Sequence, residues 1–549
     1  MRITDTSDLW WKTAVFYNLD VKTYLDWDGD GVGDFEGLAN RLDYLSDLGV
    51  TCLWLGPFFP SPRNDNGYDI SDYYGVHPDY GHLGDFVEFI RTAKDRGMRV
   101  ILDLVVNHTS EEHPWFQASR SDPEGPYGDY YLWSDEKPDE DTENMFPDVE
   151  DGVWFQDEVS GRYYRHTFYR HQPDLNTELP AVRDEIAKVL GFWLQAGADG
   201  FRVDAVPYLI NTVDGREHDF LRNLRAALSR RQGESVMLGE VNLPYDEQID
   251  FFGGEDGDEL TMQFDFVGNQ ALWLSLARSD AGPLRAALAA RPALAMGNQW
   301  GNFVRNHDEL TLDQLSESER DEVFEAFAPE PGQRIHGRGI VRRAPGMFEG
   351  DPRRLRLVYS LIFSLPGAPV LYYGEEIGMG ENPEITGSRS AVRSPMQWSN
   401  ALNGGFSRAE ADDLIAPLNE GGFGGEHVNV AAQLRDDDSL LGFTRRLVTA
   451  YRFSPEIGWG ELELLESGHP CVLAHRVTSS AGSLVAVHNF AADGRSVELD
   501  LGDLDAETTL VQLIGACDAT LDGSTLSLTL EGYGAHWIRL VPPGSLRLR

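Results

Sequence analysis

The chain has 549 residues, of which 41% are hydrophobic and 11% aromatic. This length and composition are typical of a folded protein with one large domain and one or two smaller ones, and they exclude a disordered chain. Acidic residues outnumber basic residues by 90 to 46, for a net charge of −44, so nucleic acid and anionic membranes are excluded as partners. The sequence has no apolar run of about eighteen residues and no signal peptide at its start, and we expect a cytoplasmic protein.

The acidic excess has two explanations that the sequence leaves open. It can form a solvation layer suited to high salt, where screening removes the self-repulsion, as in a halophilic protein. It can equally be inherited from the base composition of the gene, together with the preference for arginine over lysine. The three cysteines, Cys52, Cys471 and Cys517, lack metal-ligand spacing, and we expect them to be core residues rather than a disulfide framework or a zinc site.

Short apolar runs alternate with amphipathic stretches over the first 380 or so residues, which predicts strands alternating with helices. The predicted strands cover residues 14–21, 50–59, 99–108, 200–206, 236–242, 260–266, 300–309 and 368–376. Helical patterns lie between them at 35–49, 84–97 and 181–197. Eight such units indicate an α/β fold, a TIM (β/α)8 barrel, whose chemistry would lie at the carboxyl ends of the strands.

Three segments depart from this alternation. Residues 109–175, rich in Trp, Tyr, Asp, Pro and His, predict a subdomain inserted after strand 3, and residues 310–350 predict an excursion after strand 7 that begins helical and becomes irregular. Residues 457–549 carry short alternating strands typical of a C-terminal all-β sandwich domain. The catalytic barrel is accordingly assigned to residues 1–108 and 176–456.

Charged residues stand at the predicted carboxyl ends of several strands. Arg202 and Asp204 lie two apart in "GFRVDAV", so they share one face of their strand. A buried ion pair is the plain structural interpretation, although desolvation makes such pairs poor stabilisers. Glu240 in "LGEVN" and Asp308 in "RNHDE" occupy corresponding places in other strands. A mouth with several carboxylates fits glycoside cleavage with retention, which needs a nucleophile and a proton donor.

In this interpretation Asp204 is the nucleophile, and Arg202 keeps it ionised by lowering its pKa. Glu240 protonates the leaving oxygen and later activates the acceptor. Asp308, with His108 and His307, binds the hydroxyls of the distorted ring. A single histidine would more simply be a core residue, but the joint pattern favours a catalytic site.

Four ordered motifs carry a resemblance to a known family: "DLVVNH" (103–108), "GFRVDAV" (200–206), "GEVN" (239–242) and "FVRNHD" (303–308), with "QPDLN" (172–176) in addition. With these motifs the sequence resembles the α-amylase superfamily, glycoside hydrolase family thirteen. The resemblance implies the catalytic roles given above. It further implies that Asp65 and Tyr68 of "DNGYDI" close the pocket around the nonreducing glucose and that Phe168 and Gln172 line it.

Within that family the stretches "NHDELTLDQLSESERDEVF", "VRSPMQW" and "VNVAAQLRDDDSLL" resemble trehalose synthases, which interconvert maltose and trehalose by intramolecular transglucosylation with hydrolysis as a side reaction. A hydrolytic α-glucosidase on short α-linked oligosaccharides is the alternative, and a noncatalytic binding relative is a remote one. A small-molecule glucoside is the expected partner. The sequence leaves the oligomeric state open, with a homodimer as one alternative.

The stretch "DWDGDGVGD" places four carboxylates, Asp26, Asp28, Asp30 and Asp34, around glycines that permit a tight loop. Oxygen ligands at this spacing suit Ca²⁺, with the carbonyl of Val32 as a further ligand. Gly37 stands where an EF-hand would have its closing glutamate, so a full EF-hand is not expected. A solvated acidic turn is the alternative.

A second structural calcium ion is implied by the family resemblance alone. Its ligands would be Asn107, Asp174 and the carbonyls of Tyr208 and Leu209, with Asn211 where the family leads us to expect a glutamate. The proposed chemistry needs neither ion.

Overall fold

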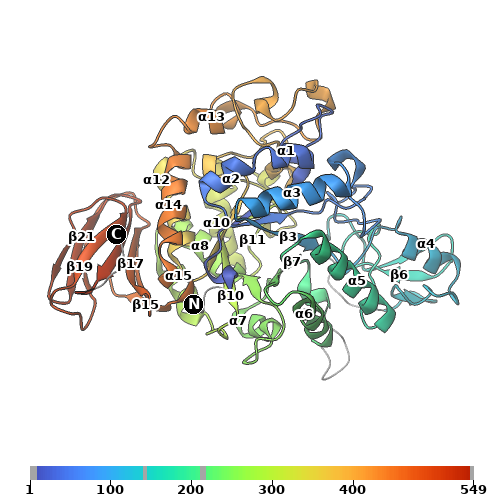
Figure 1. The fold of residues 1–549 in the computed structure, drawn as a ribbon, viewed down its shortest axis with the longest axis horizontal. Coiled ribbons are helices and arrows are strands. Elements are labelled where there is room, and N and C mark those ends of the chain that lie inside the picture. Colours follow the sequence, from blue (N-terminus) through green and yellow to red (C-terminus); the bar gives the residue numbers. More distant parts are fainter. Residues whose placement is uncertain (1–8, 140–144, 210–217, 545–549) are drawn as a thin grey trace.

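The structure of the protein is a computed structural model that describes residues 9–139, 145–209 and 218–544. Figure 1 shows three parts along its longest axis: a β domain with the C-terminus, a central part ringed by helices, and a segment with α4 and β6 at the opposite end. Among the described residues, no helix is both long enough and apolar enough to cross a membrane.

Eight parallel strands close into a barrel, which confirms the predicted fold. The strands follow one another around the barrel in chain order, and the first pairs with the eighth. They are β1 (Phe16–Leu19), β2 (Cys52–Leu55), β3 (Arg99–Leu104), β7 (Gly200–Val203), β8 (Val236–Gly239), β9 (Met262–Phe264), β10 (Gln299–Phe303) and β14 (Ala368–Tyr372). Every residue of these strands except Arg99 is buried.

Side chains alternate between the inside and the outside of the barrel, as the two-residue period of a strand requires. In β2, Cys52 and Trp54 join the apolar cluster that fills the barrel. Leu53 and Leu55 join the larger cluster between the barrel and the surrounding helices. Both faces are covered, which explains why the strands are almost continuously apolar.

Helices surround the barrel. They are α1 (Phe35–Ala39), α2 (Leu42–Leu48), α3 (Leu83–Asp95), α5 (Pro180–Ala196), α6 (Asp219–Arg231), α7 (Tyr245–Gln248), α8 (Phe266–Arg278), α9 (Gly282–Ala290), α12 (Pro352–Ser364), α13 (Val430–Gln433), α14 (Leu440–Arg452) and α15 (Pro455–Trp459). The single helix expected at 35–49 is two helices, α1 and α2. The other two predicted helices lie within two residues of α3 and α5.

The barrel strands end earlier than the sequence predicts. β7 ends at Val203 and β8 at Gly239, so Asp204 and Glu240 directly follow their strands. Ala205 has a positive φ of 49°, a conformation that L-residues other than Asn and Asp adopt rarely and at some energetic cost. This turn ends the strand and leads into the 3-10 helix η4 (Val206–Leu209).

A long segment lies between β3 and α5. It contains α4 (Pro114–Ser121) and a three-stranded antiparallel sheet of order β4-β6-β5, made of β4 (Trp133–Ser134), β5 (Trp154–Gln156) and β6 (Tyr163–Arg165). Its core is aromatic, with the ring of Phe116 5.5 Å from that of Trp133 and 5.2 Å from that of Tyr164. The aromatic composition of this segment therefore builds a small core of its own, and we call it the insert.

The segment after β10 also has structure that the sequence did not indicate. Besides the helix α10 (Glu317–Phe327) it forms a small antiparallel sheet of β11 (Leu310–Thr311), β12 (Arg334–Ile335) and β13 (Gly339–Ile340), followed by α11 (Ala344–Met347). Strands of two residues are too short to show a period of two, which is why this part was expected to be irregular.

The C-terminal domain is a sandwich of two antiparallel sheets, as predicted. One sheet has the order β15-β16-β17-β22-β19 and the other β18-β21-β20. The strands are β15 (Glu461–Leu465), β16 (Val472–Ser479), β17 (Gly482–Asn489), β18 (Arg495–Asp500), β19 (Thr509–Ile514), β20 (Thr520–Asp522), β21 (Thr525–Leu530) and β22 (Ala535–Val541). Apolar residues of both sheets form one buried cluster.

The larger sheet of the sandwich packs on α12 of the barrel through a polar cluster. Trp537 is fully buried and donates from Nε1 to Ser360 Oγ at 2.9 Å. The same hydroxyl lies 2.9 Å from Nε2 of His488, and Nε2 of His475 lies 3.0 Å from the Ser364 carbonyl. Burial lowers the pKa of His475 to about 4. The domain is therefore attached through specific hydrogen bonds as well as apolar contact.

We expect Trp537→Ala to destabilise the protein by about 3–5 kcal/mol, because it leaves a large cavity in the interface and removes the hydrogen bond from the indole to Ser360. Thermal and urea unfolding followed by tryptophan fluorescence would measure the loss. Met296→Ala is the matched control, since Met296 is 72% exposed. Equal stability of the two variants would contradict this account of the interface.

Candidate active site

Arg202 lies in β7 and its guanidinium contacts three carboxylates. Nη1 lies 2.6 Å from Asp103 Oδ1 and 2.6 Å from Asp204 Oδ1, and Nη2 lies 2.6 Å from Glu240 Oε2. Asp103 comes from the neighbouring strand β3, where it is the register partner of Arg202. The two carboxyls predicted to act as nucleophile and proton donor are thus held by the two terminal nitrogens of one planar group.

Aromatic side chains hold the guanidinium in place. Its centre lies 5.2 Å from the ring of Trp54 and 5.9 Å from the ring of Tyr68, distances typical of cation–π contact. Trp54 Nε1 and the Tyr68 hydroxyl also donate to Asp103 Oδ2, each at 3.1 Å. The two rings hold the guanidinium, and the two hydrogen bonds hold Asp103. Arg202 therefore has little freedom to move away from the carboxylates.

Asp308 follows β10 and has a separate set of cations. Its Oδ1 lies 2.8 Å from Arg393 Nη2 and 3.1 Å from Arg389 Nη1, and Oδ2 lies 3.1 Å from His307 Nε2. Nε2 of His307 also lies 2.5 Å from the Tyr68 hydroxyl. Burial raises the pKa of Asp308, but the two arginines outweigh it and hold this pKa well below its usual range. Burial lowers the pKa of His307, so this ring is neutral.

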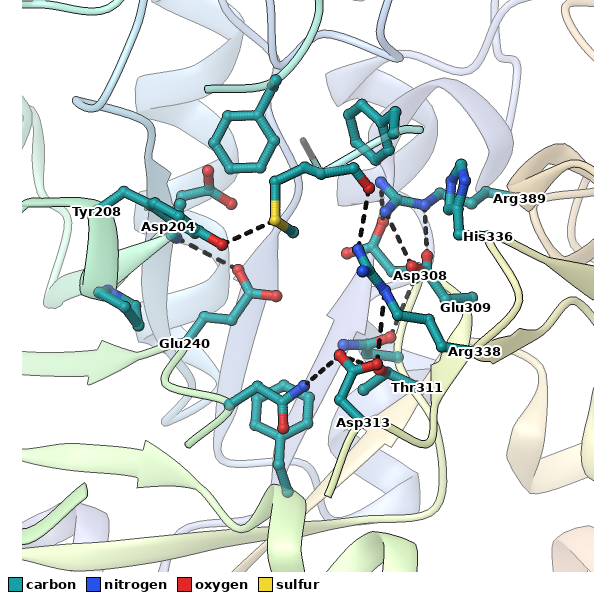
Figure 2. Close-up of a pocket in the computed structure, with 18 of the residues that line it drawn as sticks. Asp204, Tyr208, Glu240, Asp308, Glu309, Thr311, Asp313, His336, Arg338 and Arg389 are labelled. Carbon is teal, nitrogen blue, oxygen red and sulfur yellow. Dashed lines mark hydrogen bonds and ion pairs between the residues drawn. The ribbon is translucent and has the colours of Figure 1, made fainter. Parts of the chain in front are cut away.

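A cavity of about 610 Å³ opens at this end of the barrel. Asp204, Glu240 and Asp308 line it, and Figure 2 shows their carboxyl groups around one space. The cavity is also lined by the predicted sugar-binding residues Asp65, Tyr68, His108 and Phe168. Gln172 donates to Asp65 Oδ2 at 2.9 Å and so acts on the cavity through that carboxylate. His307 and Arg202 lie behind the carboxylates, as described above.

A profile described as "Alpha amylase, catalytic domain" matches residues 21–320 and 342–458, and one described as "Sucrose hydrolase-like, C-terminal domain" matches residues 482–539. The chain belongs to the α-amylase family. The first profile covers most of the chain, and the barrel with its carboxylates at the strand ends is the part that it matches.

Among members of the α-amylase family the chain is similar to "Trehalose synthase" from Pimelobacter sp. (strain R48), with 41% identity over 97% of this chain and 96% of that protein. It is also similar to "Trehalose synthase/amylase TreS" from Mycobacterium tuberculosis (strain CDC 1551 / Oshkosh), with 41% identity over 97% of this chain and 90% of that protein. The crystal structure of the trehalulose synthase MutB from Pseudomonas mesoacidophila MX-45 superposes with a TM-score of 0.78 at 26% identity, covering 97% of this chain and 99% of that one.

The protonation of the two central carboxyls is set by opposing effects. Burial raises the pKa of Asp204 to about 7, although Arg202 lowers it, and the nearby Asp103 and Asp308 carboxylates raise it further. Burial likewise raises the pKa of Glu240 to about 7 against the effect of Arg202. Arg202 lowers the pKa of Asp204, as expected, but desolvation is the larger effect and leaves this pKa raised. The two groups titrate as a pair that shares a proton near neutral pH.

The acidic loop at residues 26–34 brings three of its four aspartates together. One carboxylate oxygen from each of Asp26, Asp28 and Asp34 lies within 4.8 Å of the others. Asp30 is not one of this group, and its Oδ1 accepts from the backbone N–H of Val32 at 2.8 Å. The loop is far along the chain from the catalytic strand ends, and its residues do not line the cavity.

Two residues of the second calcium prediction, Asn107 and Asp174, are paired with protein groups. Asp174 Oδ2 lies 2.9 Å from Nη1 of Arg165, and Asp174 Oδ1 accepts from Asn107 Nδ2 at 3.2 Å. The positive partner of Asp174 in this structure is thus an arginine. Leu209 is buried, and the Tyr208 hydroxyl lies 2.7 Å from the Met145 sulfur in the cavity wall. Asn211 lies outside the described residues, and a calcium ion here stays a prediction.

Several residues of the site were not identified from the sequence. Asp103 had a detectable signal, since it lies in a predicted strand and a carboxylate in a buried strand needs a cation. Arg389 belongs to the 3-10 helix η8 (Arg389–Val392), and Arg393 follows it. They lie in the irregular loop after β14, where no periodicity indicates which side chains turn inward. Glu309 directly follows Asp308 and was not identified either, and its Oε2 accepts from Arg389 Nε at 2.5 Å.

We expect kcat/KM to depend on pH as a bell centred near pH 7, because turnover needs Asp204 ionised and Glu240 protonated. Arg202 lowers the pKa of both carboxyls, so Arg202→Met should move the bell to higher pH and lower kcat/KM by about 10²-fold or more. Initial rates on maltose between pH 5 and 9 would measure both effects. Arg120→Met, in the insert, is the control for loss of a cation, and a bell displaced to lower pH in Arg202→Met would refute the assignment.

Proposed function

We propose that the protein is a trehalose synthase, which converts maltose and trehalose into each other by intramolecular transglucosylation, with hydrolysis as a side reaction. The observation that carries the proposal is the pairing of Asp204 and Glu240 on one guanidinium at the cavity. Similarity to two proteins named trehalose synthase over nearly the whole chain supports it.

The first step forms a glycosyl-enzyme. Asp204 Oδ1 is held by Arg202, which leaves Oδ2 to attack the anomeric carbon of the nonreducing glucose. Glu240 donates its proton to the glycosidic oxygen as the bond between carbon and oxygen breaks, and a free glucose results. Asp308 is ionised and fixed by two arginines, so it accepts hydrogen bonds from the hydroxyls of the distorted ring.

The second step joins the sugars again. The freed glucose presents its anomeric hydroxyl, Glu240 as carboxylate takes that proton, and the oxygen attacks the same anomeric carbon and releases Asp204. Two displacements retain the α configuration and give trehalose. The same chemistry with water as acceptor gives glucose, so the outcome depends on whether the freed glucose stays and water stays out.

Parts of the insert and of the loops after β10 and β14 meet over the cavity, and we call this group the roof: residues 145–148, His336, Arg338 and Arg389. The ring of Phe146 lies 5.0 Å from that of His336, and the guanidinium of Arg389 lies 5.5 Å from the Phe146 ring. A roof over the acceptor space favours the isomerase over a hydrolytic α-glucosidase. A noncatalytic role is disfavoured because such a protein has no need to hold Asp204 and Glu240 on one guanidinium at the cavity.

The test is to incubate the protein with maltose and to follow trehalose and glucose separately with time. We expect trehalose to form faster than glucose, and Asp204→Asn to abolish both products because the substituted amide cannot form the glycosyl ester. Circular dichroism would verify that the variant is folded. Glucose alone from the wild type would mean a hydrolase, and trehalose formation by Asp204→Asn would remove the nucleophile assignment.

We further propose a structural Ca²⁺ site at Asp26, Asp28 and Asp34. The three carboxylates converge within reach of one ion, and hard oxygen ligands suit Ca²⁺. Bound calcium would offset their mutual repulsion and fix the loop. It would take no part in the reaction, which Asp204 and Glu240 carry.

We expect Ca²⁺ to raise the midpoint of thermal unfolding, with a stabilisation of about 2.7 kcal/mol at a hundred times the dissociation constant. Asp28→Asn should weaken this effect because it removes a converging carboxylate. Asp30→Asn is the matched control from the same loop and should keep it. Scans with calcium and with a chelator measure the shift, and identical scans for the wild type would exclude the site.

A further inference from the structure

Arg338 connects two segments of the roof. Its Nη2 donates to the carbonyl of Met145 in the insert at 2.9 Å, and its Nε lies 3.4 Å from Asp313 Oδ1 after β11. The side chain of Arg338 is 19% exposed. Figure 2 shows Arg338 and Asp313 facing each other across the cavity from Asp204. The contact joins residues 193 positions apart in the chain.

Asp313 in turn contacts the loop that follows the proton donor Glu240. Its Oδ2 accepts from Asn242 Nδ2 at 3.1 Å and from Thr311 Oγ1 at 2.8 Å. Asn242 stands two residues after Glu240 and lines the same cavity. A proton donor lies beside the glycosidic oxygen that it protonates, so groups on its loop face the leaving glucose. Asn242, Asp313 and Arg338 therefore border the space of the acceptor.

The contact of Arg338 with the insert is polar and short, whereas the others in the roof are mainly ring contacts. Phe146 packs against Tyr169 at 4.4 Å between ring centres and against His336 at 5.0 Å. Ring contacts of this kind tolerate sliding. A guanidinium that binds a carbonyl with one nitrogen and a carboxylate with another fixes distance and direction together.

We propose that Arg338 is a specificity-determining residue: by joining Met145 of the insert to Asp313, it keeps the roof over the acceptor space, so that the freed glucose is retained and water is excluded. The proposal rests on the proposed isomerase function. It concerns the fate of the ester between Asp204 and the glucosyl group. Attack by the glucose hydroxyl gives a disaccharide, and attack by water gives glucose, with the acceptor proton passing to Glu240 in both cases.

The test is the partition between transfer and hydrolysis in Arg338→Met, which roughly keeps the length of the side chain and removes its hydrogen bond to Met145 and its ion pair with Asp313. With maltose plus ¹³C-labelled glucose in solution, the wild type should form trehalose that carries little label. In Arg338→Met we expect the ratio of trehalose to glucose to fall about fivefold or more and labelled glucose to enter the trehalose. Release of p-nitrophenol from p-nitrophenyl α-glucoside should fall by a smaller factor than the ratio of trehalose to glucose, because an activated leaving group needs little support from the acceptor space to form the glycosyl-enzyme.

Arg334→Met is the matched control. Arg334 lies in the same loop and donates from Nε to the Ala328 carbonyl and from Nη2 to that of Pro329, so its loss removes a cation without touching the insert. Arg338→Lys keeps the charge but has a single nitrogen in place of the guanidinium, so we expect a smaller fall in the ratio of trehalose to glucose. This variant is used for the test if Arg338→Met does not fold.

Wild-type partition and wild-type exclusion of label in folded Arg338 variants would overturn the proposal. A wild type that makes no trehalose would instead overturn the function on which the proposal rests. A parallel loss of p-nitrophenol release and of trehalose would also overturn it, since that result would mean a general effect on the site.

Discussion

The guanidinium of Arg202 is the interaction on which the site depends. It is buried among the carboxyl ends of the barrel strands, and three carboxylates contact it. One positive charge cannot balance three negative charges where little water reaches them, so burial favours a proton on the group. Burial raises the pKa of Asp103 too, although Arg202 and the hydrogen bonds from Trp54 and Tyr68 lower it. The proton is therefore shared within the group of three carboxyls, and a retaining mechanism uses the state in which Glu240 carries it and Asp204 is ionised.

Charge is distributed differently around Asp308. Two arginines from the loop after β14 face that carboxylate, so it stays ionised in the same cavity where its neighbours share a proton. Three acidic side chains thus have distinct roles because the cations are divided unequally among them. The acidic surface of the protein has no part in this arrangement, since the site is balanced locally by arginines.

The barrel and its three carboxylates could be predicted from the sequence because they depend on local patterns. Buried parallel strands give apolar runs, and residues directly after such runs collect at one end of a barrel. The roof could not be predicted in this way. Arg338 and Met145 lie in irregular segments far apart in the chain, and their meeting is decided by how those segments fold. The effect of Arg202 on the pKa of Asp204 could be predicted, but the net rise could not, because a sequence shows the neighbouring arginine and not the depth of burial.

The roof also bears on how fast the enzyme can work. If the Arg338 contact keeps the roof over the acceptor space as proposed, that contact and the ring contacts around Phe146 break when a disaccharide enters or leaves and form again before the bond is cleaved and rejoined. The overall rate then depends on how often the two segments separate. They must stay together, on average, for longer than the freed glucose needs to rotate into position for the second attack. Slow release of the freed glucose thereby favours transfer over hydrolysis.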